Sequence, residues 1–263
     1  MMSANAQHGD HGHLPDARDL LDKHVASTGG ERAHLALKSR KKTGKLAVKM
    51  SGHDFVASIE DQALAPNKTH SSIDGDFFFQ VSVCDGEQAW EWRPGHSHGD
   101  EDVNLDAGQT EFVTGGRKAR AIEKANFYAA VNWRDRLVDV KTIGLVEVDG
   151  APAFEVQVTT KSEETYSQFY DKSSGRLVKR VRNTPSMLGN IDMEVYFRDY
   201  QEFDGLWVAM TVHAVLKTAD GEDGSQTWTW SKVEHNKKVS LSLFELPEEL
   251  SASEPMKAPH RTH

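Results

Sequence analysis

Alternation of apolar and polar residues with a period of two dominates the chain, and residues 193–212 show it most clearly. Residues 193–198 (MEVYFR) offer one apolar and one polar face, whereas residues 206–212 (LWVAMTV) are apolar on nearly both faces. Asp204-Gly205 lies between these runs, and Asp-Gly favours a type I′ hairpin turn, because both central residues of that turn need a positive φ. The stretch predicts a central β-hairpin of a large curved sheet with an apolar concave side.

The same period predicts most of the remaining chain to be strand. Turns are expected at Asp85-Gly86, at Asp149-Gly150 and at 173–175. A spacing of about a dozen residues for each strand and turn is typical of one sheet of meandering hairpins. The further strands are expected near 41–50, 53–62, 67–74, 76–84, 87–93, 138–148, 153–161, 165–171, 175–182 and 228–233.

Helical spacing replaces the period of two in two places. Ala17, Leu20 and Leu21 follow a helical period, which Gly29-Gly30 ends before a second short helix over 31–37. Residues 109–133 predict a helix or helix pair inserted between strands, amphipathic enough to cover the open side of the sheet. The fold class is therefore mainly β (α+β).

Length and composition indicate a single domain at 15–247, between a disordered His-rich tail (1–14) and a disordered C-terminal tail (248–263). The formal net charge of −9 argues against a nucleic-acid partner. Cys84 is the single cysteine, which excludes an internal disulfide and a cysteine-based zinc site.

Aromatic residues gather on one face of two neighbouring predicted strands. Phe77 and Phe79 share a face, and Trp90 and Trp92 share a face after the turn at 85–86. These side chains either form core or line a lipid cavity, since apolar ligand sites use the same residue types.

Candidate chemistry is sparse. The polar stretch 93–106 predicts a loop in which His96 and His98 lie beside three acidic residues, a set that either binds a divalent metal or forms a solvated acidic loop. The chain has no Gly-x-Ser-x-Gly, Walker, dinucleotide-binding or His-Glu-x-x-His motif. We therefore expect a protein that is not an enzyme and that needs no cofactor.

Several short motifs occur in a characteristic order between residues 15 and 247. They are Thr28-Gly29-Gly30, Asp85-Gly86 before Trp90, Asn126-Phe127-Tyr128, Tyr170-Asp171 before Ser174-Gly175-Arg176-Leu177-Val178, Tyr196-Phe197-Arg198-Asp199-Tyr200, Asp204-Gly205, and Val233-x-x-Asn236 with Ser242-Leu243-Phe244. In this order they resemble the LolA/LolB-like outer-membrane lipoprotein-sorting superfamily, in a branch outside the archetypal carriers.

The resemblance implies an unclosed antiparallel β-barrel of about eleven strands, a half-pipe covered by the inserted helices acting as a lid. It also implies a non-enzymatic, monomeric periplasmic carrier of lipids or acylated lipoproteins that meets a membrane-associated donor or acceptor protein. Arg117 and Arg120 flank the insert but match no family motif, so no lid-closing residue is carried over. The candidate ligand-binding residues are Phe77, Phe79, Trp90, Trp92, Val195, Phe197 and Trp207.

Two alternatives remain open at this stage. A metal-binding or interaction module would use His96 and His98. The small-x-small pattern at 3–6 predicts export with removal of a signal peptide, and a plain cytosolic tail is the other interpretation.

Overall fold

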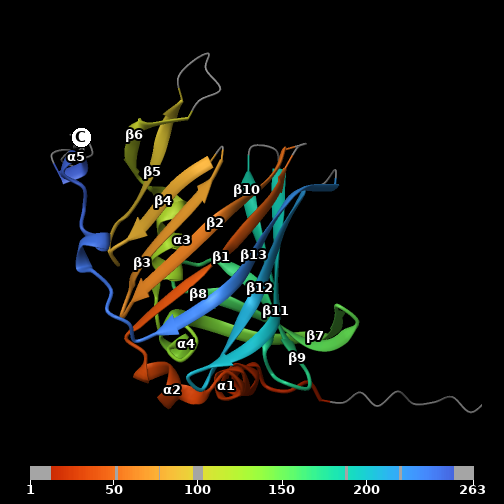
Figure 1. Ribbon diagram of the computed structural model, residues 1–263. Coiled ribbons are helices and arrows are strands. Elements are labelled where there is room, and N and C mark those ends of the chain that lie inside the picture. The colour runs from red at the N-terminus through yellow and green to blue at the C-terminus, as the bar shows by residue number, and fades with distance from the viewer. Residues whose placement is uncertain are drawn as a thin grey trace, which may run out of the picture.

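The computed structural model describes residues 13–50, 53–76, 78–96, 103–186, 189–218 and 221–251. Thirteen strands form one antiparallel sheet in the order β6-β5-β4-β3-β2-β1-β13-β12-β11-β10-β9-β8-β7 (Figure 1). The strands are β1 (Ser39–Met50), β2 (His53–Leu64), β3 (Lys68–Gly75), β4 (Phe78–Cys84), β5 (Ala89–His96), β6 (Val103–Phe112), β7 (Leu137–Val148), β8 (Ala151–Thr160), β9 (Thr165–Asp171), β10 (Leu177–Ser186), β11 (Gly189–Phe203), β12 (Leu206–Thr218) and β13 (Gly221–His235). The helices are α1 (Ala17–Ser27), α2 (Gly30–Ala36), α3 (Gly115–Ala125), α4 (Trp133–Arg136), the 3-10 helix η1 (Leu241–Phe244) and α5 (Glu248–Ser251).

The sheet curves strongly but does not close. Strands β6 and β7 are its two edges, and β1 pairs with β13 at its middle. In Figure 1 the sheet runs from β6 across β1 and β13 to β7 and β8 at the back. The predicted unclosed half-barrel is therefore confirmed. No helix in the described ranges is long and apolar enough to span a membrane.

The sheet has thirteen strands rather than about eleven, and one of them forms where no strand was predicted. Residues 103–112, expected to be part loop and part helix, form β6 and pair with β5. The helix α3 begins only at Gly115. The alternation at 109–112 does not distinguish a helix from a strand, because such a short run fits either period. The segment is a strand because it pairs with Trp90 and Trp92 of β5.

The central hairpin forms as predicted. Asp204 has φ 52° and Gly205 has φ 80°, so both central residues of the turn are left-handed. Phe203 pairs with Leu206 directly across this turn, and β11 and β12 stay paired as far as Asp192. The turn thus sets the register of the two long strands at the middle of the sheet.

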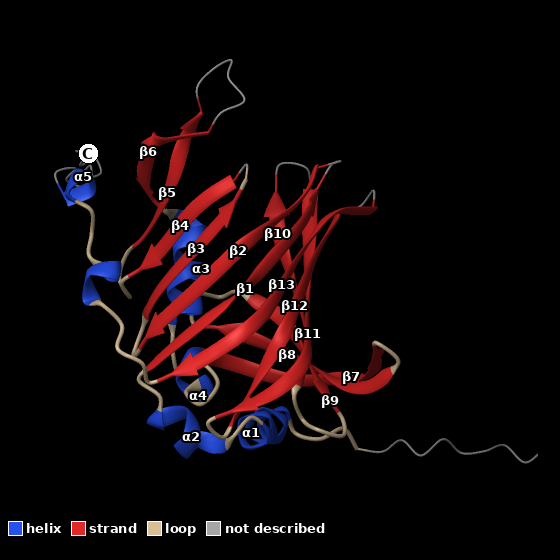
Figure 2. Cartoon of the chain, in the orientation of Figure 1, coloured by secondary structure: helices blue, strands red, loops and turns tan. Residues whose placement is uncertain are grey.

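Strand register assigns each side chain to one face of the sheet, because directly paired residues point the same way. Phe197 pairs with Val212, Val212 with Trp228, and Trp228 with Leu46. Phe197 packs against the cluster that contains Leu20 and Leu21 of α1. Because α1 closes the lower end of the half-barrel, with α3 and α4 inside the curve (Figure 2), this face is the concave one.

The predicted N-terminal helices are confirmed, and α1 packs on the concave side. Asp16 caps α1 by accepting a 2.7 Å hydrogen bond from the Arg18 amide. Leu20 and Leu21 are buried against β8–β10, in one cluster with Tyr170. The helix thereby fills the end of the half-barrel where β8–β10 would otherwise leave apolar side chains open.

The chain end covers the opposite, convex face. Phe244 of η1 and Leu250 of α5 are buried together with Val83 and Trp90. Residues 248–251, which were expected to begin a disordered tail, form α5. This satellite core is separated from the concave side by the sheet itself.

Candidate functional site

The concave face of the central strands is apolar, and many of its side chains are only half-buried. We call this set the apolar concave surface. Its half-buried members are Phe55, Ile73, Phe78, Val195, Phe197, Val208, Val212 and Trp228. Buried residues such as Leu46 and Met210 lie between them on the same face. The surface extends over seven neighbouring strands, from β4 and β3 through β1 to β12 and β11.

The structure divides the predicted ligand-binding residues between two faces. Val195 and Phe197 lie on the concave face. Trp207 lies on the convex face, because it neighbours the concave Val208 along β12 and adjacent residues of a strand point to opposite faces. The guanidinium carbon of Arg176 lies 3.7 Å from the centre of the Trp207 ring. A single cavity therefore cannot contain the whole predicted set.

The β4–β5 aromatics also point away from the apolar concave surface. Phe79 and Trp92 contact each other edge-on at 5.3 Å between ring centroids. Trp90 borders a cavity of the concave side, but its ring packs in the convex core. On β4 it is Phe78, 5.7 Å from Phe55, that faces inward. Phe77 lies outside the described residues.

A cavity of about 410 Å³ lies between α3 and the strands β1–β5. We call it the cationic cavity. Its ionisable lining side chains are Arg40, Lys42, Asp61, His70, Glu91, Arg117, Arg120 and Lys124. Cys84, Ala89 and Val113 line it too, where α3 packs on the sheet through Ala121 and Ala125. The volume lies within the range of about 300–1,000 Å³ common for small-molecule sites.

Burial perturbs the ionisable groups at the floor of the cationic cavity. Burial lowers the pKa of Lys42 to about 7, and the attraction of Asp61 offsets only part of that effect. Burial would raise the pKa of Asp61, but Lys124 and Lys42 outweigh it and hold the pKa below its usual value. The Lys42 Nζ lies 3.8 Å from the Asp61 carboxylate, which also accepts a 2.6 Å hydrogen bond from the Ser71 hydroxyl.

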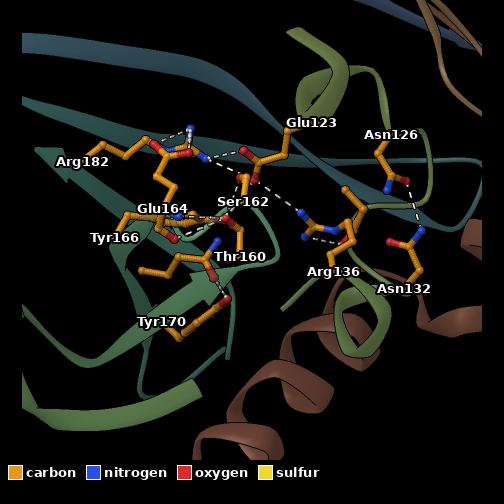
Figure 3. Close-up of polar contacts among 12 residues, drawn as sticks. Glu123, Asn126, Asn132, Arg136, Thr160, Ser162, Glu164, Tyr166, Tyr170 and Arg182 are labelled. Carbon is orange, nitrogen blue, oxygen red and sulfur yellow. Dashed lines mark hydrogen bonds and ion pairs between the residues drawn. The ribbon is translucent and has the colours of Figure 1, made fainter. Parts of the chain in front are cut away.

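Helix α3 is tied to the far side of the half-barrel through Glu123 (Figure 3). Arg182 of β10 donates from one Nη to both Glu123 carboxylate oxygens, at 3.2 and 3.1 Å. Arg136 of α4 donates at 3.4 Å and Tyr166 of β9 at 3.3 Å to the same carboxylate. Arg182 also lies 3.4 Å from Glu164. We call these five residues the Glu123 network.

The Glu123 network is the strongest connection between the inserted helix and the far wall. Glu123 and Arg182 are 22% and 15% exposed, so solvent screens their attraction only partly. Burial would lower the pKa of Arg182, but Glu123 and Glu164 raise it, and the guanidinium stays charged. The other face of α3 packs on β4 and β5. The helix therefore bridges strands seven places apart in the sheet order.

The two arginines considered at the insert have a different arrangement. Arg117 pairs with Glu91 at 2.8 Å, on the β5 side of the cationic cavity. Arg120 lines that cavity and, within the described ranges, has no ion pair. Neither reaches across the half-barrel as Glu123 does.

The predicted metal site lies mostly outside the described residues. His98 and the acidic residues beside it lie outside the described residues, as does the side chain of His96. In the described part of the chain, no group of three or more His, Cys, Asp or Glu could hold a metal ion.

Sequence reasoning missed the cationic cavity and the Glu123 network. Arg40 and Lys42 lie two apart in a run of basic residues at the start of β1, where alternation places both on one face. That spacing was the one indication in the sequence that two basic side chains lie together on one face of β1. Arg182 and Glu123 are 59 residues apart, and nothing local relates them.

Comparisons with known proteins bear on the fold. No protein-family model and no curated protein matches the sequence. A DUF1329 family protein from Desulfovibrio piger aligns with a TM-score of 0.59 at 12% identity, over 88% of this chain and 98% of that one. A LolA superfamily protein from Nitrosomonas europaea aligns with a TM-score of 0.56 at 12% identity, over 89% and 99% of the two chains.

A third solved structure agrees with these two. A domain described as an outer membrane lipoprotein-sorting protein, from Vibrio parahaemolyticus, aligns with a TM-score of 0.51 at 12% identity, over 87% of this chain and 97% of that one. All three alignments span nearly the whole half-barrel. The chain therefore has the LolA-like fold, an open antiparallel half-barrel with helices on its concave side.

Proposed function

We propose that the protein is a non-enzymatic periplasmic carrier that holds the acyl chains of lipids or acylated lipoproteins on its apolar concave surface. The observation that carries this proposal is the row of half-buried aromatic and aliphatic side chains across β2–β4 and β11–β13, with the buried Leu46 of β1 between them, on the side that the helices partly cover. Solved structures of the same fold include one described as lipoprotein-sorting, which supports the class of cargo and the compartment.

The apolar concave surface can bind an acyl chain without catalysis. Each methylene removed from water stabilises the complex by about 0.8 kcal/mol, so ten buried methylenes contribute up to about 8 kcal/mol. Phe197, Val212 and Trp228 are direct cross-strand neighbours and form a continuous apolar row. A chain lying along this row exchanges water contacts for side-chain contacts over its whole length.

Release requires the complex to open, and the Glu123 network is where opening is controlled. The inserted residues 113–136 cross the concave side between β6 and β7, and Glu123 fixes them to β10 through Arg182. Breaking this contact frees α3 from the far wall, while its contacts with β4 and β5 remain. Cargo exchange is then a shift between closed and open populations.

A matched pair of variants tests the proposal. Val212→Glu places a carboxylate on the apolar concave surface, whereas Thr211→Glu places it on the convex face, one residue away on the same strand. Binding of a fluorescent fatty acid should fall at least about tenfold in Val212→Glu, since a charge facing an acyl chain must be desolvated. Thr211→Glu should bind as the wild type does.

Circular dichroism and urea unfolding check that both variants are folded. Equal probe binding by folded Val212→Glu and the wild type would overturn the assignment of the concave surface. Fractionation of the cells that make the protein tests the periplasmic placement separately, and a cytosolic pool alone would contradict it.

A further inference from the structure

The cationic cavity contains more positive charge than its own carboxylates neutralise. Five lining side chains are lysine or arginine and two are carboxylates in the part of the chain that the structure describes. Glu91 is already shared by Arg117 and Arg93, at 2.8 and 2.7 Å. Arg120 and Lys124 have no ion pair with any described residue. This excess of cations lies inside a chain whose net charge is −9.

Arg40 and Lys42 are half-buried, whereas Arg117, Arg120 and Lys124 are exposed, and Arg40 has the fewer partners of the two. Its Nε is buried and lacks a hydrogen-bond partner, and among the described residues its guanidinium has no ion pair. Its guanidinium carbon lies 5.7 Å from the centre of the Phe127 ring. The side chain is nevertheless not sealed off, since it lines the cavity. Asp61 attracts the guanidinium but forms no ion pair with it, and burial lowers the pKa of Arg40 despite that attraction. A buried charge that is only partly compensated is costly, so this position favours an anion in the cavity.

The cationic cavity adjoins the apolar concave surface. Lys42 Nζ lies 3.7 Å from the centre of the Trp230 ring, and Trp230 packs with Leu46 and Ile59. Along β1, Arg40 and Lys42 are followed on the same face by Leu46. Charge therefore gives way to apolar surface along one strand, within a few residues.

We propose that the cationic cavity binds the phosphate or carboxylate head of an amphiphile whose acyl chain lies on the apolar concave surface. The chain part rests on the proposed function, and the anion site stands on the cavity alone. Arg40, Lys42 and Lys124 approach from β1 and from α3, so they surround an anion from two sides. Ionised donors bind phosphate and carboxylate more strongly than neutral ones do. The 410 Å³ volume is large enough for the head group and the first atoms of a chain.

Calorimetry on the full chain tests the proposal with three probes at fixed pH and ionic strength: decyl phosphate, 1-decanol and inorganic phosphate. The variants are Lys42→Met and Lys124→Met, and the matched control is Lys45→Met. Lys45 is exposed on the convex face of the same strand, three residues from Lys42. Lys124 is an exposed helix residue, so its variant stays folded if Lys42→Met does not.

We expect the wild type to bind decyl phosphate at least about tenfold more tightly than 1-decanol. Lys42→Met and Lys124→Met should each remove most of this preference without changing 1-decanol binding, and Lys45→Met should keep it. Equal affinity for decyl phosphate and 1-decanol would overturn the anion site and leave chain binding intact. Inorganic phosphate that binds as tightly as decyl phosphate would assign the cavity to a free anion and overturn the head-group assignment. Failure of both amphiphiles would overturn the proposed function, and failure of all three probes would overturn both.

Discussion

Replacing Glu123 by Gln should release α3 from the far wall of the half-barrel. Glutamine preserves the shape of the side chain but removes the charge that faces Arg182 and Arg136, at 3.1 and 3.4 Å. Removing one partner of a fully buried ion pair costs about 3–5 kcal/mol. Here Arg182 keeps Glu164 at 3.4 Å, and the amide oxygen can still accept a hydrogen bond. We therefore expect a loss of about 2–3 kcal/mol.

The loss should be local, because α3 packs separately on β4 and β5. Hydrogen exchange of the amides at 115–125 measures it directly, since local opening limits their exchange. A loss of about 2 kcal/mol predicts exchange about 30-fold faster than in the wild type. Exchange in the central strands β12 and β13 should stay unchanged.

A matched control separates charge removal in general from this network. Asp149 pairs with Arg198 through two hydrogen bonds of 2.7 and 3.0 Å, but both side chains are more than 40% exposed. Asp149→Asn should cost less than about 1 kcal/mol. Asparagine also tolerates the positive φ of 50° at this position. If the amides at 115–125 exchange in Glu123→Gln at a rate within twofold of the wild-type rate, the role assigned to the Glu123 network is refuted.

Three further outcomes follow from the same structure. Burial lowers the pKa of Lys42 to about 7, against about 10.4 in an unfolded chain, so between these pH values the unfolded state binds more protons and the free energy of unfolding should rise with pH. Urea unfolding at pH 7 and pH 9 should show this rise in the wild type and a smaller rise in Lys42→Met. Equal rises in the two proteins would contradict the pKa shift. Phe244→Ala removes a ring that is 4% exposed in the convex core and should lower the free energy of unfolding in urea by about 3–5 kcal/mol, with fatty-acid binding unchanged. Weakened binding by the folded variant would argue against the separation of the two faces. Burial raises the pKa of the Cys84 thiol, so iodoacetamide should modify native protein far more slowly than unfolded protein, and equal rates by mass spectrometry would show an accessible thiolate.

Local chemistry was enough to predict the hairpins and the N-terminal helix. The Asp204-Gly205 turn needs two left-handed residues and fixes a hairpin from sequence alone. The end of α1 follows from the glycines at 29 and 30, whereas its cap at Asp16 was seen only in the structure. A period of two over most of the chain leaves few alternatives to a meandering sheet, whereas the open half-barrel was predicted from the family resemblance that the order of short motifs carries.

The candidate site was less predictable, because alternation gives the phase of a strand but not which phase faces inward. On β12 both phases are apolar, so Trp207 and Val208 were equal candidates for the concave side. On β5, Trp90 is buried on the convex side because it packs with Phe244, which lies 154 residues later in the chain. Only tertiary packing resolves such cases, and it also brings together the charges of the cationic cavity.

Photoaffinity labelling with a diazirine fatty acid, followed by peptide mapping, tests the central claim most directly. If the apolar concave surface holds acyl chains, the label should attach to concave residues of β11–β13 and β1, such as Phe197, Val212 and Trp228. An excess of unlabelled fatty acid should displace it. Saturable labelling confined to the convex face, for example at Val56, which is 60% exposed there, would contradict the account.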